Sequence, residues 1–503
     1  MKRIFLLVAT AAMFAACSQT EELASLDKNK DASQEAVGFD VYMNTTRAGA
    51  AGELSTDGST GTNYKASLQA TGFGVFAYYS DNEKYSDYLK PNFMYNQKIT
   101  YIGGTGTTAW TYEPAKYWPN EFGADASSED VDYVSFFAYA PYVEFVPSSG
   151  AVDVSGVTGS SQEEIDQQIE FLQKKNIIGT IRNTNTGDPL IMYAVDWDPK
   201  TSVDLVWGVN GASDLSYNVT GTSGQSVSVK AGMPFVDMLK QANDAKISFN
   251  LRHALSWLNV QIDADFNSDG LASATPDAYH GTTNDFTDNK TKIWIRSISF
   301  DGFAAKGALD LKNEKANTPK WLDIKGADEL ETGSVTIFDG RKDNSEGVLS
   351  NEAPAEQPQT LNPNLIQSEP YSLSSTSGAV DYTAALTTTS GLTGVTKDPQ
   401  NLFAGAVGDQ IYVIPTSEAV NVTIVYDVET KDGNLATYLS DGQTRGSSIQ
   451  NRITKKDVFK NKLEAGKKYT LKLHLGMTDV KVEAVVEPWV DGSDSNTALP
   501  ENY

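Results

Sequence analysis

Three oxygen-bearing side chains in the middle of the chain have the spacing of a calcium-binding loop. Asp265, Asn267 and Asp269 alternate, and Gly270 follows where such a loop turns sharply. The twelfth position of the loop should supply a bidentate glutamate, but this chain has Pro276 there. The alternative is an ordinary Asn/Asp/Gly-rich turn after a strand. The pattern favours the turn and leaves calcium binding open.

The histidines and acids elsewhere do not form a recognisable catalytic set. His253 lies in an alternating apolar run, so a core or edge histidine is favoured over a general base. Glu163, Glu164 and Asp166 fall on the polar side of an expected helix, which favours a solvated face over a glycosidase pair. The sequence also lacks a G-x-S-x-G elbow and a phosphate-binding loop. We therefore expect no enzymatic activity, no resident metal and no cofactor.

The single cysteine stands where a lipid can be attached. Lys2 and Arg3 precede a short apolar run, and small residues lead into Cys17, which is the layout of a secretory signal peptide. The run is shorter than the roughly 20 residues that span a bilayer. A cysteine at this point resembles bacterial lipoprotein signals, in which cleavage leaves a lipid-modified cysteine. The alternative, a lone buried cysteine, would have little to pack against here.

The residues after the cysteine indicate where the protein goes. Glu21 and Glu22 lie close to the lipid and resemble an acidic export signal for the outer face of the outer membrane. The stretch has few apolar residues, so we expect a disordered tether. The sequence thus predicts a signal peptide over 1–16, a tether over 17–36 and a lipoprotein of the cell surface.

A basic residue just beyond the first expected strand is a candidate protease site. Arg47 and Ala48 open a flexible segment rich in glycine and alanine, and exposed segments of this kind are preferred sites of proteolysis. An uncut linker arginine explains the same pattern, and the two interpretations stay open.

Length and charge limit the remaining function classes. A chain of 503 residues is too long for one ordinary core, and a net charge of −25 argues against a nucleic-acid partner. Most of the chain reads as strands separated by turns, with only short helices expected at 162–174 and 233–241. The run 247–262 alternates for long enough to open a new sheet. We expect an all-β protein with domains over 37–245 and 246–503 and a long irregular insertion near 344–396.

Several segments, taken in order, resemble the fimbrillin family of pilus subunits and surface adhesins. They are the signal ending at Cys17, the strand at 72–78, the aromatic run 110–119, the strands at 134–142 and 253–256, and the ending at 465–471 before Trp489. The resemblance implies two transthyretin-like β-sandwich domains and removal of the N-terminal strand by an arginine-specific protease. A neighbouring subunit's strand would then fill the groove that is left.

Within that scheme, residues 37–43 would be the displaced strand and Arg47–Ala48 the cleaved bond. The alternating segment 480–486 is the candidate donor strand, or else simply the last strand of the second sandwich. The resemblance implies a structural and adhesive fimbrial subunit whose partners are other subunits and the outer membrane. The alternative is a surface glycan-binding lipoprotein, which exposed tryptophans among Trp110, Trp118, Trp257 and Trp294 would favour.

Overall fold

The protein folds into several β-sheets, and its one described helix, α2 (Leu68–Thr71), is a single turn. The structure is a computed structural model. It describes residues 36–43, 53–55, 64–81, 83–86, 89, 91–102, 110–119, 132–143, 177–179, 187–199, 202–211, 214–218, 226–239, 246–264, 291–323, 330–339, 342–343, 349–350, 372–373, 380–381, 392–393, 400–403, 411–432, 445–460, 462–476 and 480–488. The predicted all-β class is confirmed.

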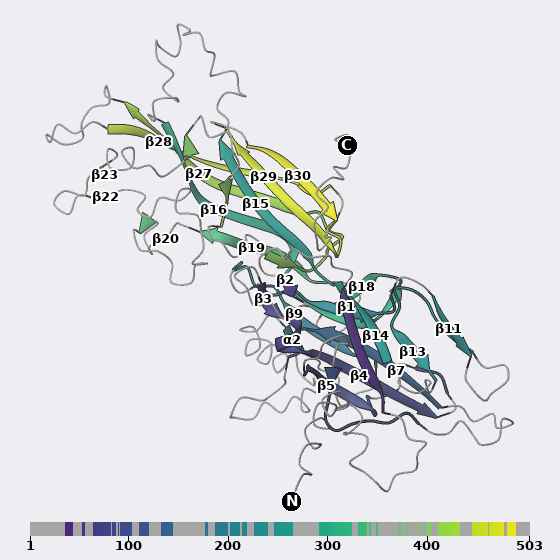
Figure 1. Cartoon of the computed structure of the whole chain (residues 1–503). Helices are drawn as coiled ribbons and strands as arrows, with labels where there is room; N and C mark the ends of the chain where they lie inside the picture. The colour runs from purple at the N-terminus through teal and green to yellow at the C-terminus, as the bar shows by residue number, and fades with distance from the viewer. Residues whose placement is uncertain are drawn as a thin grey trace, which may run out of the picture.

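An eight-stranded sheet organises the N-terminal half of the molecule (Figure 1). Its order is β1 (Gly38–Met43), β14 (Lys246–His253), β10 (Val206–Val209), β7 (Asp132–Ala140), β4 (Phe73–Asp81), β5 (Met94–Tyr101) and β6 (Trp110–Thr111), and β13 (Phe235–Met238) pairs with β7.

Both faces of this sheet are buried, which explains why its central strands are apolar throughout. Phe136 and Ala138 of β7 enter one core, whereas Phe137 and Tyr139 enter another on the opposite face. The second core is closed by a four-stranded sheet made of β18 (Thr318–Leu322), β17 (Lys306–Lys315), β9 (Leu190–Ala194) and β8 (Ile177–Gly179).

The C-terminal half is a β-sandwich of two five-stranded sheets with a third core between them. One sheet contains β25 (Gln400–Asn401), β15 (Ser256–Ala264), β29 (Lys467–Leu475), β30 (Val480–Pro488) and β26 (Ile411–Val413). The other contains β19 (Thr332–Asp339), β16 (Thr291–Ala304), β27 (Asn421–Asp432), β28 (Arg445–Lys455) and β24 (Leu392–Thr393).

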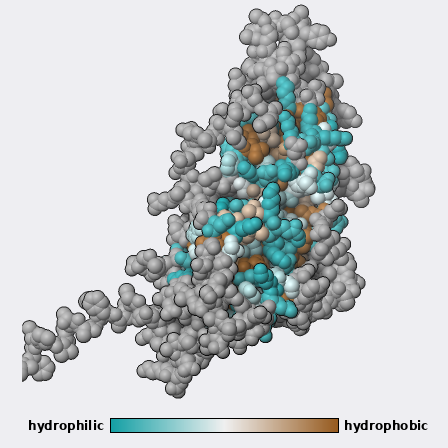
Figure 2. Space-filling view, turned by 90° about the vertical axis from the view of Figure 1, so that its right-hand side faces the viewer, coloured by the Kyte–Doolittle hydropathy of each residue, from teal (hydrophilic) through white to brown (hydrophobic). Residues whose placement is uncertain are grey.

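Eight short strands form four separate two-stranded pairs. These are β2 (Glu53–Ser55) with β3 (Tyr64–Ser67), β11 (Leu215–Asn218) with β12 (Ser226–Val229), β20 (Lys342–Asp343) with β21 (Leu349–Ser350), and β22 (Ser372–Leu373) with β23 (Val380–Asp381). In the view of Figure 2, hydrophilic residues cover much of the described surface, and hydrophobic ones reach it in separate patches.

Two details of the predicted secondary structure were wrong. The run 247–262 is not one strand, because it breaks at Ala254–Leu255 into β14 and β15, which belong to different sheets. The expected turns of helix over 233–241 are strand β13. Phe235 and Met238 share one face there because Asp237, with φ 56°, forms a bulge between them. The helix expected at 162–174 lies outside the described residues.

Two of the sheets combine strands from before and after residue 245. Strand β14 pairs with β1 and β10, and the hairpin β17–β18 returns from the C-terminal half to pair with β9. The turn of that hairpin is fixed to the N-terminal half, since the backbone N–H of Asn317 donates to the Gly232 carbonyl at 2.9 Å. The division into domains at residue 245, and the insertion near 344–396, stay predictions.

A buried carboxylate in this hairpin makes its stability depend on pH. Asp310 is 2% exposed; its Oδ1 accepts the Lys312 backbone N–H at 2.9 Å, and its Oδ2 lies 3.4 Å from Lys320 Nζ. Burial, followed by the charge of Asp188, raises the pKa of Asp310 to about 6. Because the folded state holds this proton more tightly than the unfolded state, the stabilisation is complete below the ordinary pKa of 3.8 and is lost as pH rises to about 6.

We therefore predict that Asp310→Asn raises the free energy of unfolding by roughly 1–3 kcal/mol near about pH 7.5. The gain should shrink toward about pH 4.5, where the wild-type carboxyl is itself neutral. Urea unfolding at both pH values measures the effect. Glu314→Gln, which changes an exposed carboxylate that also contacts Lys320, is the control. A gain for Asp310→Asn that does not depend on pH would contradict the assignment.

Candidate assembly site at the N-terminal edge strand

Strand β1 completes the eight-stranded sheet from its edge. It runs parallel to β14, in a register that places Gly38 opposite Lys246 and Met43 opposite Leu251. Its backbone also reaches the opposite side at its beginning, where Val37 N–H donates to the Lys116 carbonyl at 2.8 Å. Edge strands offer their free hydrogen-bonding groups to other chains. Strand β1 therefore covers β14 and is the last strand on that side of the sheet (Figure 1).

Alternation along β1 sends every second side chain into the core. Val37 and Phe39 are 1% exposed and Val41 is 7% exposed, whereas Tyr42, on the other face, is 38% exposed. Fully burying a valine or phenylalanine contributes about 1.5–3 kcal/mol, so these three side chains together contribute on the order of 5–9 kcal/mol. A strand that replaced β1 would need apolar side chains at the same alternate positions.

Phe39 occupies an aromatic pocket. Its ring centroid lies 5.5 Å from that of Tyr112, 5.7 Å from that of Phe136 and 6.1 Å from that of Phe249. The Tyr112 hydroxyl donates to the Val37 carbonyl at 2.8 Å, and burial raises the pKa of Tyr112 above its ordinary range, so the hydroxyl stays protonated. Aromatic pairs in such arrangements add about 0.5–1.5 kcal/mol each. This pocket anchors β1 in the N-terminal core.

The candidate donor, β30, lies at an edge of the other half. It pairs antiparallel with β29, from Val480 opposite Leu475 to Pro488 opposite Lys467. Val480 is fully buried and Val482 is half-buried, whereas Val486 on the same face is 38% exposed. Burial of the apolar face thus fades toward the C-terminal end of β30. In this single chain β30 is the last described strand of its sheet.

Polar contacts hold the outward face of β30, and the sequence did not point to them. Glu483 lies 3.5 Å from Lys472 Nζ and 3.7 Å from His474 Nε2. His474 Nδ1 also lies 2.7 Å from Asp263 of β15. The three strands are therefore joined across one face by side chains as well as by their ladders. Alternating charge on strands 467–475 and 480–488 is the signal that could have suggested these pairs.

The remaining candidate residues divide into two groups. His253 is buried and its Nδ1 lies 2.7 Å from Asp204 Oδ2, which confirms a histidine with a polar partner inside the fold. The other group lies outside the described residues and stays predicted: Cys17, Glu21, Glu22, Arg47, Ala48, Glu163, Glu164, Asp166, Asp265, Asn267, Asp269 and Gly270. Within the described chain, no cluster of three or more metal-ligating side chains occurs. No helix among the described residues is long and apolar enough to cross a bilayer.

An exposed aromatic platform for glycans is not found at the tryptophans that could have formed one. Trp110 and Trp118 are 8% and 4% exposed. Trp257 is half-buried, and the Lys468 ammonium lies 3.8 Å from the centroid of its ring. The side chain of Trp294 is outside the described residues. The observed burial counts against the platform that the glycan-binding alternative would require.

Comparison with known proteins gives a full-length likeness. No family model matches the chain. The fimbrium subunit Fim1C of Phocaeicola vulgatus is 24% identical over 512 residues, which cover 98% of each chain. The resemblance to the fimbrillin family is thus confirmed. Among solved structures, a fimbrial protein from Bacteroides vulgatus is 19% identical with a TM-score of 0.46, covering 90% of this chain and 99% of that one. A fimbrilin from Porphyromonas gingivalis is 10% identical with a TM-score of 0.30, covering 92% and 99%.

The anchoring of β1 can be tested on the full fimbrillin-like chain. Phe39→Ala removes the ring from its aromatic pocket, and we expect it to lower the free energy of unfolding by about 3–5 kcal/mol. Tyr42→Ala, on the exposed face of the same strand, should cost less than half as much. Chemical denaturation measures both, and hydrogen exchange of residues 38–43 reports whether β1 detaches first. Equal costs for the two variants would contradict the anchoring role of Phe39.

Proposed function

We propose that this chain is a structural and adhesive subunit of a cell-surface fimbria, exported as a lipoprotein through Cys17 and assembled by strand exchange. The full-length likeness to a fimbrium subunit carries the proposal. Its partners are other fimbrial subunits and, before processing, the outer membrane that holds the lipid. The chain supplies structure and contact surfaces in this role and performs no catalysis.

The position of β1 supports a removable strand. Arg47 follows Met43 by four residues, so cleavage at Arg47–Ala48 separates the whole of β1 and the lipid anchor from the rest of the chain. Loss of β1 opens the edge of β14 and the pocket that Phe39 fills. An open edge beside an alternating apolar groove accepts an extended strand by backbone pairing and side-chain insertion. A single cleavage would thus remove the lipid anchor and β1 together.

The pattern of β30 supports a donor role. Its inward residues Val480, Val482, Ala484 and Val486 alternate with the same period as Val37, Phe39 and Val41. Val486 is already 38% exposed in the single chain, so insertion into a neighbour's groove buries apolar surface that the subunit itself leaves open.

Cleavage is tested by treating the purified full-length protein with an arginine-specific protease. We expect SDS-resistant oligomers whose subunits begin at Ala48, whereas Arg47→Ala stays monomeric. Arg452→Ala, an exposed arginine on β28, is the matched control and should assemble like the wild type. Oligomers formed equally well by Arg47→Ala would contradict processing at this bond.

The donor role is tested by Val486→Asp. Because Val486 is exposed in the single chain, its substitution should change the free energy of unfolding by no more than about 0.5 kcal/mol. After protease treatment, the same variant should form few or no oligomers, because an aspartate cannot enter an apolar groove unpaired. Lys481→Asp, on the outward face of β30, is the control. Normal assembly of Val486→Asp would rule out β30 as the donor.

A further inference from the structure

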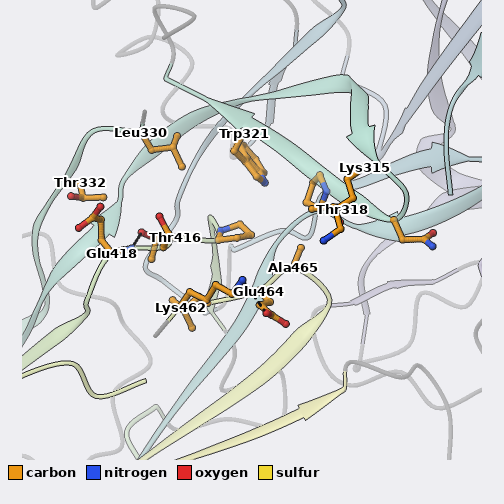
Figure 3. Close-up of a pocket in the computed structure, with 15 residues that line it drawn as sticks. Lys315, Thr318, Trp321, Leu330, Thr332, Thr416, Glu418, Lys462, Glu464 and Ala465 are labelled. Atoms are coloured by element: carbon orange, nitrogen blue, oxygen red, sulfur yellow. Dashed lines mark hydrogen bonds and ion pairs between the residues drawn. The ribbon is translucent and has the colours of Figure 1, made fainter. Parts of the chain in front are cut away.

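We infer that a pocket between the two halves of the molecule binds a small neutral carbohydrate. The cavity has a volume of about 660 Å³. This lies inside the range of about 300–1,000 Å³ that is typical of small-molecule sites. One wall is the β17–β18 hairpin and the start of β19, and the other is made by the segments 415–418 and 462–465 of the C-terminal half. Figure 3 shows Trp321 on one side of the central space and Lys462 and Glu464 on the opposite side.

The charges of the lining point to an uncharged ligand. Lys315 and Lys462 are balanced by Glu418 and Glu464, so the four ionisable groups sum to zero. Lys462 Nζ lies 3.5 Å from Glu464 Oε1, so two of the four charged groups form an ion pair with each other. A strongly anionic or cationic ligand would meet a like charge for every opposite one. A neutral ligand gains hydrogen bonds from both signs without that repulsion.

The hydrogen-bonding groups and the aromatic wall point to a polyhydroxylated ligand. Thr332 and Ser417 line the cavity together with two lysines and two glutamates, so the lining residues include both donors and acceptors. The Trp321 indole N–H is already committed to the Ala254 carbonyl at 3.0 Å, so this ring offers an apolar surface. A sugar ring presents an apolar C–H face and a rim of hydroxyls, which matches one aromatic wall and a polar rim.

Both walls are held in place before any ligand arrives. On the C-terminal side, the Leu463 N–H donates to the Thr416 carbonyl at 2.9 Å, and the Glu464 N–H donates to the Tyr469 hydroxyl at 2.8 Å. On the hairpin side, Asn313 Nδ2 donates to the Lys315 carbonyl at 2.8 Å. A site whose backbone is already fixed loses little conformational entropy on binding. These hydrogen bonds therefore fix part of each wall in the chain without ligand.

The pocket extends the proposed adhesive role by naming a ligand class, but it does not depend on strand exchange. Its lining residues lie far along the chain from β1 and Arg47, and they are present before any cleavage. The uncleaved Arg47→Ala protein should therefore bind carbohydrate as the wild type does. Failure of assembly and failure of carbohydrate binding can thus be told apart.

The test uses saturation-transfer NMR titrations of the full chain with three neutral disaccharides, namely lactose, maltose and cellobiose. We expect saturable binding of at least one, weakened at least about tenfold by Thr332→Trp, which fills the cavity, and by the double variant Glu418→Ala/Lys462→Ala. The matched control is Lys481→Ala/Glu487→Ala, an exposed pair on β30 outside the pocket, which should bind like the wild type. Unfolding curves verify that each variant is folded.

Three results would overturn the inference. One is the absence of saturable binding for all three disaccharides. Another is binding that neither pocket variant weakens, because the site would then lie elsewhere. The last is tighter binding of sialyllactose or glucosamine than of every neutral sugar, because the ligand class would then be charged.

Discussion

The attachment of β1 to one side of β14 is the constraint on which the rest of the N-terminal half depends. A sheet buried on both faces must be closed at its edges, and here the closing strand is the first one in the chain. Phe39 inserts among three aromatic rings that belong to β7, β14 and the segment after β6. The strand is therefore essential to the core. Among the described strands it pairs along its whole length with β14 alone, and the residue before it, Val37, is hydrogen-bonded on the other side.

The path from the groove to the candidate donor runs through a short link. Strand β14 ends at His253, and β15 begins at Ser256, next to β29 and then β30. After strand exchange, β14 and β30 of one subunit would each pair with a strand of a neighbouring subunit. Within the subunit, these two strands are connected by residues 254–255 and by the pairing of β15 with β29 and of β29 with β30. The hairpin β17–β18, fixed to Gly232 and to β9, braces the same junction from the opposite direction. The same hairpin lines the pocket that we propose to bind carbohydrate.

Much of the fold followed from the sequence because alternation is a local property. Strands near 37–43, 72–78, 134–142 and 480–486 were predicted and are confirmed, since β-branched and aromatic residues there alternate or fill both faces. The break at Ala254–Leu255 was missed, although the inward positions change from odd numbers in β14 to even numbers in β15. The helix expected at 233–241 was wrong because an i, i+3 apolar pair also fits a bulged strand.

The sites were less predictable, because they depend on pairings between distant segments. Nothing local indicates that Tyr112 would hold Val37, or that residues near 318 and 463 would face each other across a pocket. Parallel pairing of β1 with β14 joins residues about two hundred positions apart. The alternation of apolar and polar residues along a strand shows which face is buried but cannot specify such a distant partner. Arg47 could be selected only because it follows a strand and opens a flexible segment, and its processing remains a prediction.

The most direct test of the account is intact-mass and N-terminal analysis of the protein recovered from its native cell surface. The account predicts subunits that begin at Ala48, lack β1 and Cys17, and occur in SDS-resistant assemblies. A monomer that retains β1 and a lipid on Cys17 would contradict strand exchange and leave an anchored surface protein.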